Sequence, residues 1–562
     1  MRGEYGQAMT QNSVELAVIR AWIDADPDPV TRDEMEKLIV AMPDSISELA
    51  DRFAGRLQFG TAGLRGAVGA GPNRMNRLVV RQAAAGLMDW LPGGAKVVIG
   101  YDARTTSEAF AIETARVVEA KGGTAVLGNG FVPTPALAFA VTNHEADAGV
   151  MVTASHNPAG DNGYKVYLND GAQLVSPADT EIEEAISIVA ANGFDPGEPY
   201  LADPVDFLTP YIDAMHAVLG VSVPGARPLK VVYSAMHGVG SEGIRKLFGR
   251  LGLDELIVVP EQDEPDGTFP TAPFPNPEEA GALDLAFALA KEVEADFVIA
   301  NDPDADRLAL AVNGPTGWGR LTGDQLGLLL ADSVLDHTDG DDRIVASSLV
   351  SSSSLGVLAA ARGVAYQSTL TGFKWIVKVG RPGSGKRLVF GYEEALGYCV
   401  STKVLDKDGI SAAAELVRRA QELSMVGSNL PERLAEIFAE IGVFVTDQHV
   451  ERVEGSGAQE KLTAIMASLR SDPPTTIGSR VISVEDLLGD ADKDADVLTY
   501  RLEDGSRIIL RPSGTEPKLK AYLEATAPPT GDVAQVAAVE VELQQRLDKL
   551  KGSVAELIGN RT

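Results

Sequence analysis

The chain of 562 residues contains only one cysteine, Cys399, and six histidines. One cysteine cannot form a disulfide within the chain, so we expect a reducing compartment and a cytoplasmic location. Structural zinc sites need several closely spaced Cys and His ligands, and the scattered histidines with one cysteine do not supply such a set. A disulfide framework and a zinc module are therefore not expected.

Long apolar runs and an excess of positive charge are also missing. No stretch of about 18 uninterrupted apolar residues occurs, so no transmembrane helix is expected, and the first residues lack the apolar core of a signal peptide. Asp and Glu number 80 against 49 Lys and Arg, which gives a net charge of −31. That charge repels nucleic acids and acidic membranes, so neither is expected as a partner. Binding of an anionic substrate would require cationic side chains gathered in a few loops.

The sequence does contain many short β-branched runs that alternate with amphipathic segments. After a helical stretch over residues 13–55, such runs occur at 95–102, 123–129, 148–155, 229–235, 255–261, 295–302, 343–350 and 386–393. The alternation predicts parallel sheets covered by helices on both faces. After about residue 445 the pattern changes to hairpin-forming strands and a closing helix over 533–559.

We therefore predict three α/β domains with mixed, mostly parallel sheets and a smaller C-terminal α+β domain. The predicted boundaries are 1–222 for domain I with its helical N-terminal extension, 223–338 for domain II, 339–446 for domain III and 447–562 for domain IV.

The segment 148–165 places a serine where an apolar strand ends. Ser155 follows this strand in a polar loop with His156, and Lys165 lies downstream. Ligand sites in parallel α/β sheets lie at the carboxyl ends of strands, where a serine can act as a nucleophile if a partner group activates it. A serine that caps a helix in a turn is the structural alternative.

The segment 295–307 places three aspartates after another strand. Asp302, Asp304 and Asp306 occupy alternate positions, and in an extended loop alternate side chains project to one side. Converging carboxylates repel unless a cation lies among them, and hard oxygen ligands suit Mg²⁺ or Ca²⁺. An EF-hand is excluded, because Arg307 stands where that loop requires glycine. The sequence favours a metal site over a solvated acidic turn.

Two further loops follow strands. Glu393 and Glu394 can accept hydrogen bonds from sugar hydroxyls, or they can begin a helix, whose first turn favours acidic residues. The other loop offers a guanidinium, two hydroxyls and flexible backbone amides that suit a phosphate dianion, in Arg511, Ser513, Gly514 and Thr515. A nucleophile, a metal site, hydroxyl acceptors and a phosphate site together make a phosphoryl-transfer inventory.

Two motifs point to nucleotides and are set aside. Gly238, Gly240 and Gly243 match a dinucleotide-binding fingerprint, but Met236 and His237 separate the strand from the first glycine. A nucleotide-dependent oxidoreductase is therefore only a remote alternative. The stretch 380–387 nearly matches a P-loop but ends in arginine and precedes a strand, so a turn is predicted.

The loop motifs together resemble the α-D-phosphohexomutase superfamily, which includes phosphoglucomutases and phosphomannomutases. The similar segments are FGTAGLRG (59–66), TASHNP (153–158), DPDADR (302–307), GYEEALG (391–397) and RPSGTEPK (511–518). GAGPNRMN (69–76) is similar to the long branch that contains bacterial phosphoglucomutases and phosphopentomutases. The resemblance covers nearly the whole chain and implies four domains around a central cleft.

The resemblance also implies residue roles and cofactors. Ser155 would carry the phosphoryl group and, with Asp302, Asp304 and Asp306, bind one Mg²⁺ ion. Other roles follow motif by motif: catalysis for Arg65, Lys165 and His156, and substrate binding for Arg307, Lys374, Glu393, Glu394, Arg511, Ser513, Gly514 and Thr515. A sugar bisphosphate such as glucose 1,6-bisphosphate would serve as activator, and the protein would be a monomer or homodimer.

The expected reaction interconverts α-D-glucose 1-phosphate and glucose 6-phosphate through a bisphosphorylated sugar. Phosphomannomutase and phosphopentomutase activities are the close alternatives. Many hexomutases place a serine where this chain has Ala395, and a histidine frequent in phosphomannomutases is missing near Tyr398. The missing hydroxyl keeps a pentose 1-phosphate open as substrate. A catalytically silent sugar-phosphate binder is a further alternative, against which Ser155 and the three aspartates argue.

Overall fold

The computed structural model describes residues 15–60, 63–220, 223–253, 256–381, 383–453, 457–490, 493–513 and 518–561. The chain divides into two compact units. Unit 1 comprises Met1–Ser222, Pro228–Gly319 and Ser401–Ala414, and unit 2 comprises Val223–Arg227, Arg320–Val400 and Glu415–Thr562. None of the described helices is both long and apolar enough to cross a membrane.

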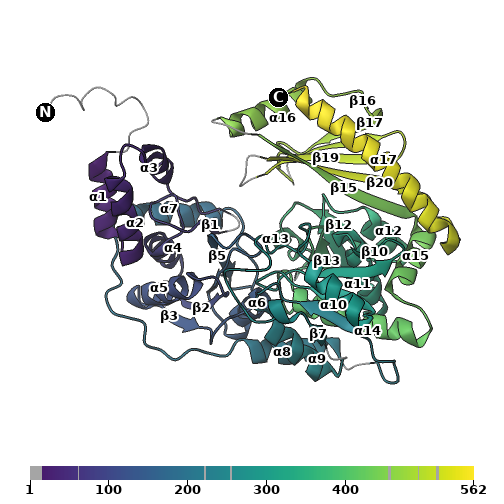
Figure 1. Ribbon diagram of the computed structural model, residues 1–562, viewed down its shortest axis with the longest axis horizontal. Helices are drawn as coiled ribbons and strands as arrows, with labels where there is room; N and C mark the ends of the chain where they lie inside the picture. The colour runs from purple at the N-terminus through teal and green to yellow at the C-terminus, as the bar shows by residue number, and fades with distance from the viewer. Residues whose placement is uncertain are drawn as a thin grey trace. The chain divides into compact units, whose positions relative to one another are not determined.

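Unit 1 begins with the predicted helices α1 (Leu16–Ala25), α2 (Pro29–Val40) and α3 (Ile46–Arg52) (Figure 1). Asp28 caps α2 by accepting a hydrogen bond from the Val30 amide, and Pro29 stands in the first turn, where its missing N–H costs nothing. The three helices share a small core that includes Trp22, Met35 and Leu49.

The first sheet of unit 1 has the order β1-β5-β4-β2-β3. Its strands are β1 (Leu64–Ala67), β2 (Lys96–Tyr101), β3 (Thr124–Leu127), β4 (Ala148–Val152) and β5 (Asp161–Leu168), and its helices are α4 (Arg77–Trp90), α5 (Ser107–Ala120), α6 (Thr134–Asn143) and α7 (Ala178–Asn192). Strands β3, β2 and β4 are parallel, whereas β5 is antiparallel to both β4 and β1.

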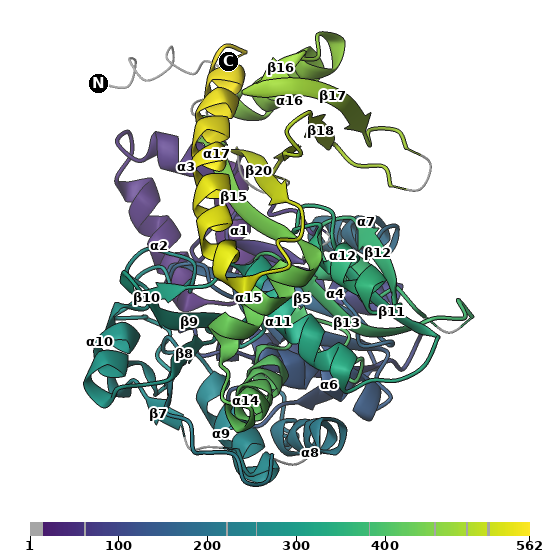
Figure 2. The ribbon, with the colours of Figure 1, turned by 90° about the vertical axis from the view of Figure 1, so that its right-hand side faces the viewer.

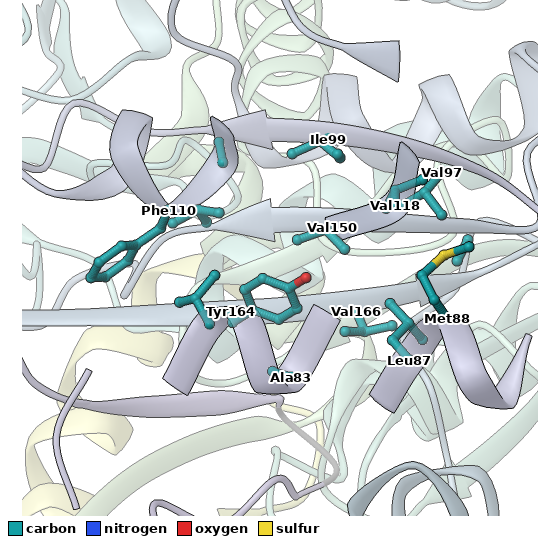
Figure 3. Packing of buried hydrophobic residues seen from close by; sticks show 14 of the residues in the cluster. Ala83, Leu87, Met88, Val97, Ile99, Phe110, Val118, Val150, Tyr164 and Val166 are labelled. Atoms are coloured by element: carbon teal, nitrogen blue, oxygen red, sulfur yellow. The ribbon is translucent and has the colours of Figure 1, made fainter. Parts of the chain in front are cut away.

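Alternation along the strands gives this sheet two apolar faces. Figure 3 shows Val97 and Ile99 of β2 and Val150 of β4 in one cluster with Ala83 and Leu87 of α4. On the other face α6 lies so close that a Cβ added at Gly100 would be 3.1 Å from the Leu137 side chain. The helix layers fix the sheet, and therefore fix the loops that leave the carboxyl ends of β2 and β4.

The second sheet of unit 1 has the order β10-β9-β8-β6-β7. Its strands are β6 (Val231–Ser234), β7 (Leu256–Val258), β8 (Phe297–Ala300), β9 (Ala309–Gly314) and β10 (Gly317–Arg320), and the neighbouring helices are α8 (Leu208–Leu219), α9 (Gly240–Leu251), the short 3₁₀ helix η1 (Pro260–Gln262) and α10 (Asp284–Val293). Strand β6 is parallel to β7 and β8, and β9 is antiparallel to β8.

Unit 2 contains a third mixed sheet of order β12-β11-β13-β14. Its strands are β11 (Arg343–Ser348), β12 (Ala365–Thr369), β13 (Arg387–Glu393) and β14 (Gly397–Cys399), and the helices of this region are α11 (Gly323–Asp336), α12 (Ser354–Ala361), α13 (Phe373–Ile376), α14 (Gly409–Met425) and α15 (Leu430–Ile441). Strands β12, β11 and β13 are parallel, and β14 returns antiparallel to β13.

The C-terminal part of unit 2 is the predicted sheet of hairpins, with the order β15-β20-β19-β18-β17-β16. It consists of β15 (Val443–Arg452), β16 (Thr476–Ile477), β17 (Ser479–Asp486), β18 (Leu498–Leu502), β19 (Arg507–Pro512) and β20 (Lys518–Ala527), with α16 (Ala458–Ser471) between β15 and β16. The closing helix α17 (Val533–Gly559) packs along β15 and β20 (Figure 2).

These sheets confirm the predicted fold class, with three mixed α/β sheets followed by an antiparallel α+β domain. The predicted domain boundaries at 222/223, 338/339 and 446/447 stay a prediction.

Candidate functional site

Ser155 lies in the loop that leaves the carboxyl end of β4. Its side chain is buried, and its backbone has a φ of 52°, which side-chain-bearing residues rarely adopt. The Ser155 amide donates a hydrogen bond of 2.8 Å to Thr153 Oγ1, which in turn donates to Asp102 Oδ2 at 2.7 Å. No helix follows Ser155, so the alternative of a helix-capping serine is wrong.

The three aspartates after β8 do converge. Single ligand atoms of Asp302, Asp304 and Asp306 all lie within 4.8 Å of one another, and the three side chains are buried. A turn produces this convergence, because the Ala305 amide donates to Asp302 O and Ala305 has a φ of 59°. The expectation of an extended loop is therefore wrong, because the loop contains a turn. The turn nevertheless brings the same three side chains together.

Ser155 meets this aspartate cluster across the two sheets of unit 1. Its Oγ donates a hydrogen bond of 2.7 Å to Asp302 Oδ2, although the residues are 147 positions apart in the sequence. The predicted nucleophile and the predicted metal ligands therefore share one buried site.

Two buried lysines balance the charge of the cluster. Lys165 Nζ lies 2.6 Å from Asp304 Oδ2 and 2.9 Å from Asp306 Oδ2, and Lys407 Nζ lies 3.2 Å from Asp306 Oδ2. Burial alone would lower the pKa of Lys165, but the carboxylates of Asp304 and Asp306 raise it above its ordinary value. Lys165 is thus an ammonium ion. Lys407 was missed by the sequence analysis, and its only signal is its place between Asp406 and Asp408.

The aspartates titrate as a group. Burial and the charges of Asp304 and Asp306 raise the pKa of Asp302 well above its ordinary value. Burial opposes ionisation of Asp304 as well, but the charge of Lys165 and hydrogen bonds hold the pKa of Asp304 below its ordinary value.

The cluster fits a divalent cation. Asp304 Oδ1 and Asp306 Oδ1 are buried and accept no hydrogen bond, so each keeps an oxygen for a ligand. Carboxylate oxygens are the donors that hard cations such as Mg²⁺ prefer. Asp302 accepts from Ser155 Oγ at Oδ2 and from the Arg307 amide at Oδ1, and it completes a cluster whose possible ligands are all carboxylate oxygens.

Three more predicted residues border Ser155. Arg65, exposed on β1, donates to Asn157 Oδ1 at 3.3 Å. Arg307 Nε lies 3.9 Å from Asp302 Oδ2 and 3.8 Å from Asp306 Oδ1. The ring of His156 places Nδ1 3.4 Å from Ser155 Oγ. Burial, with the charges of Arg307 and Arg65, lowers the pKa of His156 well below its ordinary value, so this imidazole is neutral.

Two glycines of the dinucleotide-like motif, Gly238 and Gly240, pack closely against the aspartate loop. A Cβ at Gly238 would lie 2.3 Å from Pro303 Cα, and one at Gly240 would lie 3.1 Å from Ala305 Cβ. The Val239 amide also donates to Pro303 O at 2.8 Å. Gly238 and Gly240 therefore permit close packing against the loop of the three aspartates, which accounts for these two positions without a nucleotide.

The sugar-loop candidates lie in unit 2, where β13 ends at Glu393 and a hairpin leads into β14. The two acids therefore do not begin a helix. Glu393 Oε1 accepts a hydrogen bond of 2.7 Å from the Gly372 amide, and Lys374 is buried two residues further on, in α13.

The Glu394 carboxylate is held by two serine hydroxyls. Its Oε2 accepts from Ser348 Oγ at 3.1 Å and Ser351 Oγ at 3.2 Å. Burial and the charges of Glu393 and Asp324 raise the pKa of Glu394 to about 7.

The phosphate-loop candidates begin at the end of β19. Arg511 lines a cavity of about 230 Å³ together with Thr371, Trp375 and Asp496. The Ser513 amide donates to Lys518 O at 2.8 Å, which closes the base of the loop. The remaining two candidates, Gly514 and Thr515, lie outside the described residues.

In the stretch that nearly matches a P-loop, the described residues form a turn. Its described residues from 383 to 386 precede β13, so a strand follows where a P-loop requires a helix.

Comparison with known proteins identifies the family. The chain matches the four phosphoglucomutase/phosphomannomutase domains in order: α/β/α domain I at residues 56–192, domain II at 209–317, domain III at 322–440 and the C-terminal domain at 452–543. A Haemophilus influenzae protein described as "Probable phosphomannomutase" is 44% identical over 476 residues, which cover 83% of this chain and 96% of that protein. The mouse phosphopentomutase is 33% identical over 588 residues, which cover 95% and 93% of the two chains.

Solved structures agree on the fold. A phosphoglucomutase/phosphomannomutase family protein from Burkholderia thailandensis superposes with a TM-score of 0.66 at 22% identity, and the match covers 88% of this chain and 98% of that one. With all four domains matched in order, the chain belongs to the phosphoglucomutase/phosphomannomutase family of the α-D-phosphohexomutase superfamily, a family of intramolecular phosphotransferases.

Proposed function

We propose that the protein is a Mg²⁺-dependent phosphosugar mutase that works through a phosphorylated Ser155. The observation that carries this proposal is the hydrogen bond of 2.7 Å between Ser155 Oγ and Asp302 Oδ2, at a cluster of three buried carboxylates. A nucleophile, an oxygen-only cation site and fixed positive side chains in one place are what phosphoryl transfer needs.

The proposed transfer balances in both directions. The bond between phosphorus and Ser155 Oγ breaks as a bond from phosphorus to a sugar hydroxyl oxygen forms, and the hydroxyl proton replaces the phosphoryl group on Oγ. On the return, a bond from Ser155 Oγ to the phosphorus of the other phosphate forms as that phosphate's bond to the sugar oxygen breaks. The neutral His156 ring, with Nδ1 3.4 Å from Oγ, can relay the Oγ proton to the leaving sugar oxygen.

Cations would stabilise the phosphoryl group as it moves. Mg²⁺, when bound by Asp302, Asp304 and Asp306, would neutralise part of the charge on the phosphoryl oxygens. Lys165 is fixed as an ammonium ion, while Arg65 and Arg307 supply guanidinium groups beside the same loop. Fixed charges of this kind stabilise a transition state without reorganising during the reaction.

Substrate recognition is proposed for the residues of unit 2. Glu393 and Glu394 would accept hydrogen bonds from sugar hydroxyls, and Lys374 and Arg511, with Ser513, Gly514 and Thr515, would bind the phosphate that is not reacting. Arginine suits this role because its planar fork matches two phosphate oxygens at once.

The favoured substrate pair is α-D-glucose 1-phosphate and glucose 6-phosphate. Mannose phosphates are an alternative. A pentose 1-phosphate is the second candidate, and a specific observation supports it. Ala395, half-buried beside Glu394, offers no hydroxyl to a hexose, and a phosphopentomutase is among the relatives that match nearly the whole chain.

The test measures Mg²⁺-dependent isomerisation of glucose, mannose and ribose 1-phosphates, primed with glucose 1,6-bisphosphate. Ser155→Ala should abolish turnover, with a loss of at least about 10⁴-fold in kcat, because the variant lacks the hydroxyl proposed to carry the phosphoryl group. Ser333→Ala, which removes a buried hydroxyl that donates to Glu415 on the helices of unit 2, serves as a serine control. Absence of turnover with every sugar in the primed wild type would refute the mutase proposal, as would unchanged kcat in Ser155→Ala.

A further inference from the structure

Arg104 is a buried arginine beside the proposed phosphoserine loop that has no role in the reaction described above. It follows β2 in the sequence Asp-Ala-Arg, and only 1% of its side chain is exposed. Its guanidinium donates four short hydrogen bonds, and all four acceptors are backbone carbonyls of the loop 155–161. These are Ser155 O at 2.7 Å, Asn157 O at 2.6 Å, Pro158 O at 2.7 Å and Asp161 O at 2.9 Å.

One side chain therefore donates hydrogen bonds to four backbone carbonyls in the irregular segment from Ser155 to Asp161. Buried carbonyls need donors, and an irregular loop has no regular backbone ladder to supply them. A guanidinium presents five N–H donors in a rigid planar fork, so one arginine can hold several carbonyls at fixed relative positions. A lysine ammonium has three donors and no fixed plane, so it could not reproduce all four bonds.

Asp102 extends the same support to the other side of Ser155. It lies 3.2 Å from Arg104 Nε and accepts a hydrogen bond from Thr153 Oγ1, which accepts from the Ser155 amide. Ser155 is thus held at its amide through Thr153 and Asp102, and at its carbonyl by Arg104. This double attachment keeps Ser155 in its left-handed conformation, which is unfavourable without such constraints.

The aromatic ring of Phe269, from the segment before α10, lies over the guanidinium of Arg104. The Phe269 ring centroid lies 5.0 Å from Arg104 Cζ, and a Cβ at Gly267 would lie 2.5 Å from Arg104 Cα. The segment before α10 therefore packs directly on Arg104, and this arginine joins the loop of Ser155 to the region that carries Asp302.

We propose that Arg104 is a positioning residue, which fixes the loop 155–161 so that Ser155 Oγ stays in place at Asp302. The inference rests on the proposed function of Ser155. The guanidinium of Arg104 donates to backbone carbonyls of the protein. Loss of Arg104 should therefore lower kcat by changing the geometry of the loop, and the affinity for the sugar should stay nearly unchanged.

The test compares Arg104→Met with wild type and with Arg81→Met. Arg81 is a matched control, because its side chain is also buried, at 8% exposed, and pairs with Glu113 on helices of the same sheet. Arg104→Met should lower kcat about 100-fold, as small misplacements of reacting groups do, with KM within about threefold. Arg104→Lys should recover about tenfold of that loss.

A second readout needs no activity. Hydrogen exchange of backbone amides should become faster in a peptide covering 153–162 of Arg104→Met, and remain at the wild-type rate there in Arg81→Met. Equal kcat losses in the two methionine variants, or wild-type exchange in this peptide, would overturn the proposal. If Arg104→Met does not fold, Arg104→Lys is judged on the same two readouts.

The two proposals fail in distinguishable ways. An inactive wild type, or an active Ser155→Ala, refutes the phosphoserine mechanism while the exchange rates still report on the loop. An active wild type with normal kcat and exchange in Arg104→Met refutes only the positioning role.

Discussion

The two groups of candidate residues hold their carboxylates in different ways. In unit 1, Asp304 and Asp306 are buried against the ammonium groups of Lys165 and Lys407. In unit 2, Glu393 and Glu394 are held by a backbone amide and by two serine hydroxyls. One set is stabilised by full charges and the other by neutral donors.

This difference matches the two tasks that we propose. A phosphoryl group in transfer carries several negative charges, so its site needs fixed cations and a divalent ion. A sugar is neutral apart from its phosphate, so its hydroxyls need oriented acceptors without a dense array of charge. Burial, with the charges of Glu393 and Asp324, raises the pKa of Glu394 to about 7.

The largest effect is expected from removing one charge of the aspartate cluster. Asp306→Asn should weaken Mg²⁺ binding at least about 100-fold and lower kcat by a similar factor, because the cluster then loses a ligand while both lysines stay. Isothermal titration with Mg²⁺ and steady-state assays measure the two effects. Asp147→Asn, which removes a carboxylate that accepts a hydrogen bond from the Lys96 amide in the same unit, is the control. Unchanged Mg²⁺ affinity would show that the cluster is not the metal site.

A smaller effect on activity is expected from a change at Glu393 in unit 2, where neutral donors hold the carboxylates. Glu393→Gln keeps the shape but loses the charged acceptor, so kcat/KM should fall about 10- to 100-fold. Phosphorylation of Ser155 and Mg²⁺ affinity should stay at wild-type values, which mass spectrometry and calorimetry can measure. A loss of Mg²⁺ binding in this variant would contradict the division of tasks between the two groups.

Unit 2 also contains a dense ion-pair network on its helices α11, α14 and α15. Asp332 of α11 accepts hydrogen bonds from Arg419 and Arg433. At the end of α11, His337 Nε2 lies 2.8 Å from Glu422 Oε1, and Glu415 is also near. Hydrogen bonds to Glu415 and Glu422 raise the pKa of His337 to about 9.

The smallest effect is therefore one on stability alone. The pKa of His337 is higher in the folded protein than its ordinary value of 6.5, so its contribution is complete below pH 6.5 and is lost as the pH rises through about 9. His337→Asn should lower Tm by about 2 °C at pH 6, since a partly exposed pair contributes roughly 0.5–1 kcal/mol. The difference should vanish above pH 9.5.

Thermal scans from pH 6 to 10 test this prediction. In a Glu422→Gln background, the effect of His337→Asn at pH 6 should shrink, because one partner is already missing. A Tm difference that is constant over the whole range would show that His337 acts by packing and not by its charge.

Much of this arrangement could be predicted from the sequence because it depends on local patterns. Apolar β-branched runs marked the strands, and polar residues directly after them marked the loops that carry Ser155, Asp302, Glu393 and Arg511. The closing helix α17 matched its predicted span, since its apolar residues recur at helical spacing. Strand ends in α/β sheets gather at one edge, so the sequence also indicated which loops carry function.

Only the tertiary structure decided how these groups meet. A left-handed turn at Ala305, and not an extended loop, brings the three aspartates together. Lys407 joins them from a segment about a hundred residues away, and its place between Asp406 and Asp408 does not indicate that it contacts Asp306. The structural roles of Gly238 and Arg104 likewise follow from their tertiary contacts and not from their sequence neighbours. Local sequence determines the conformation of a segment, but the contacts of a buried charge or a close-packed glycine depend on how distant segments fold together.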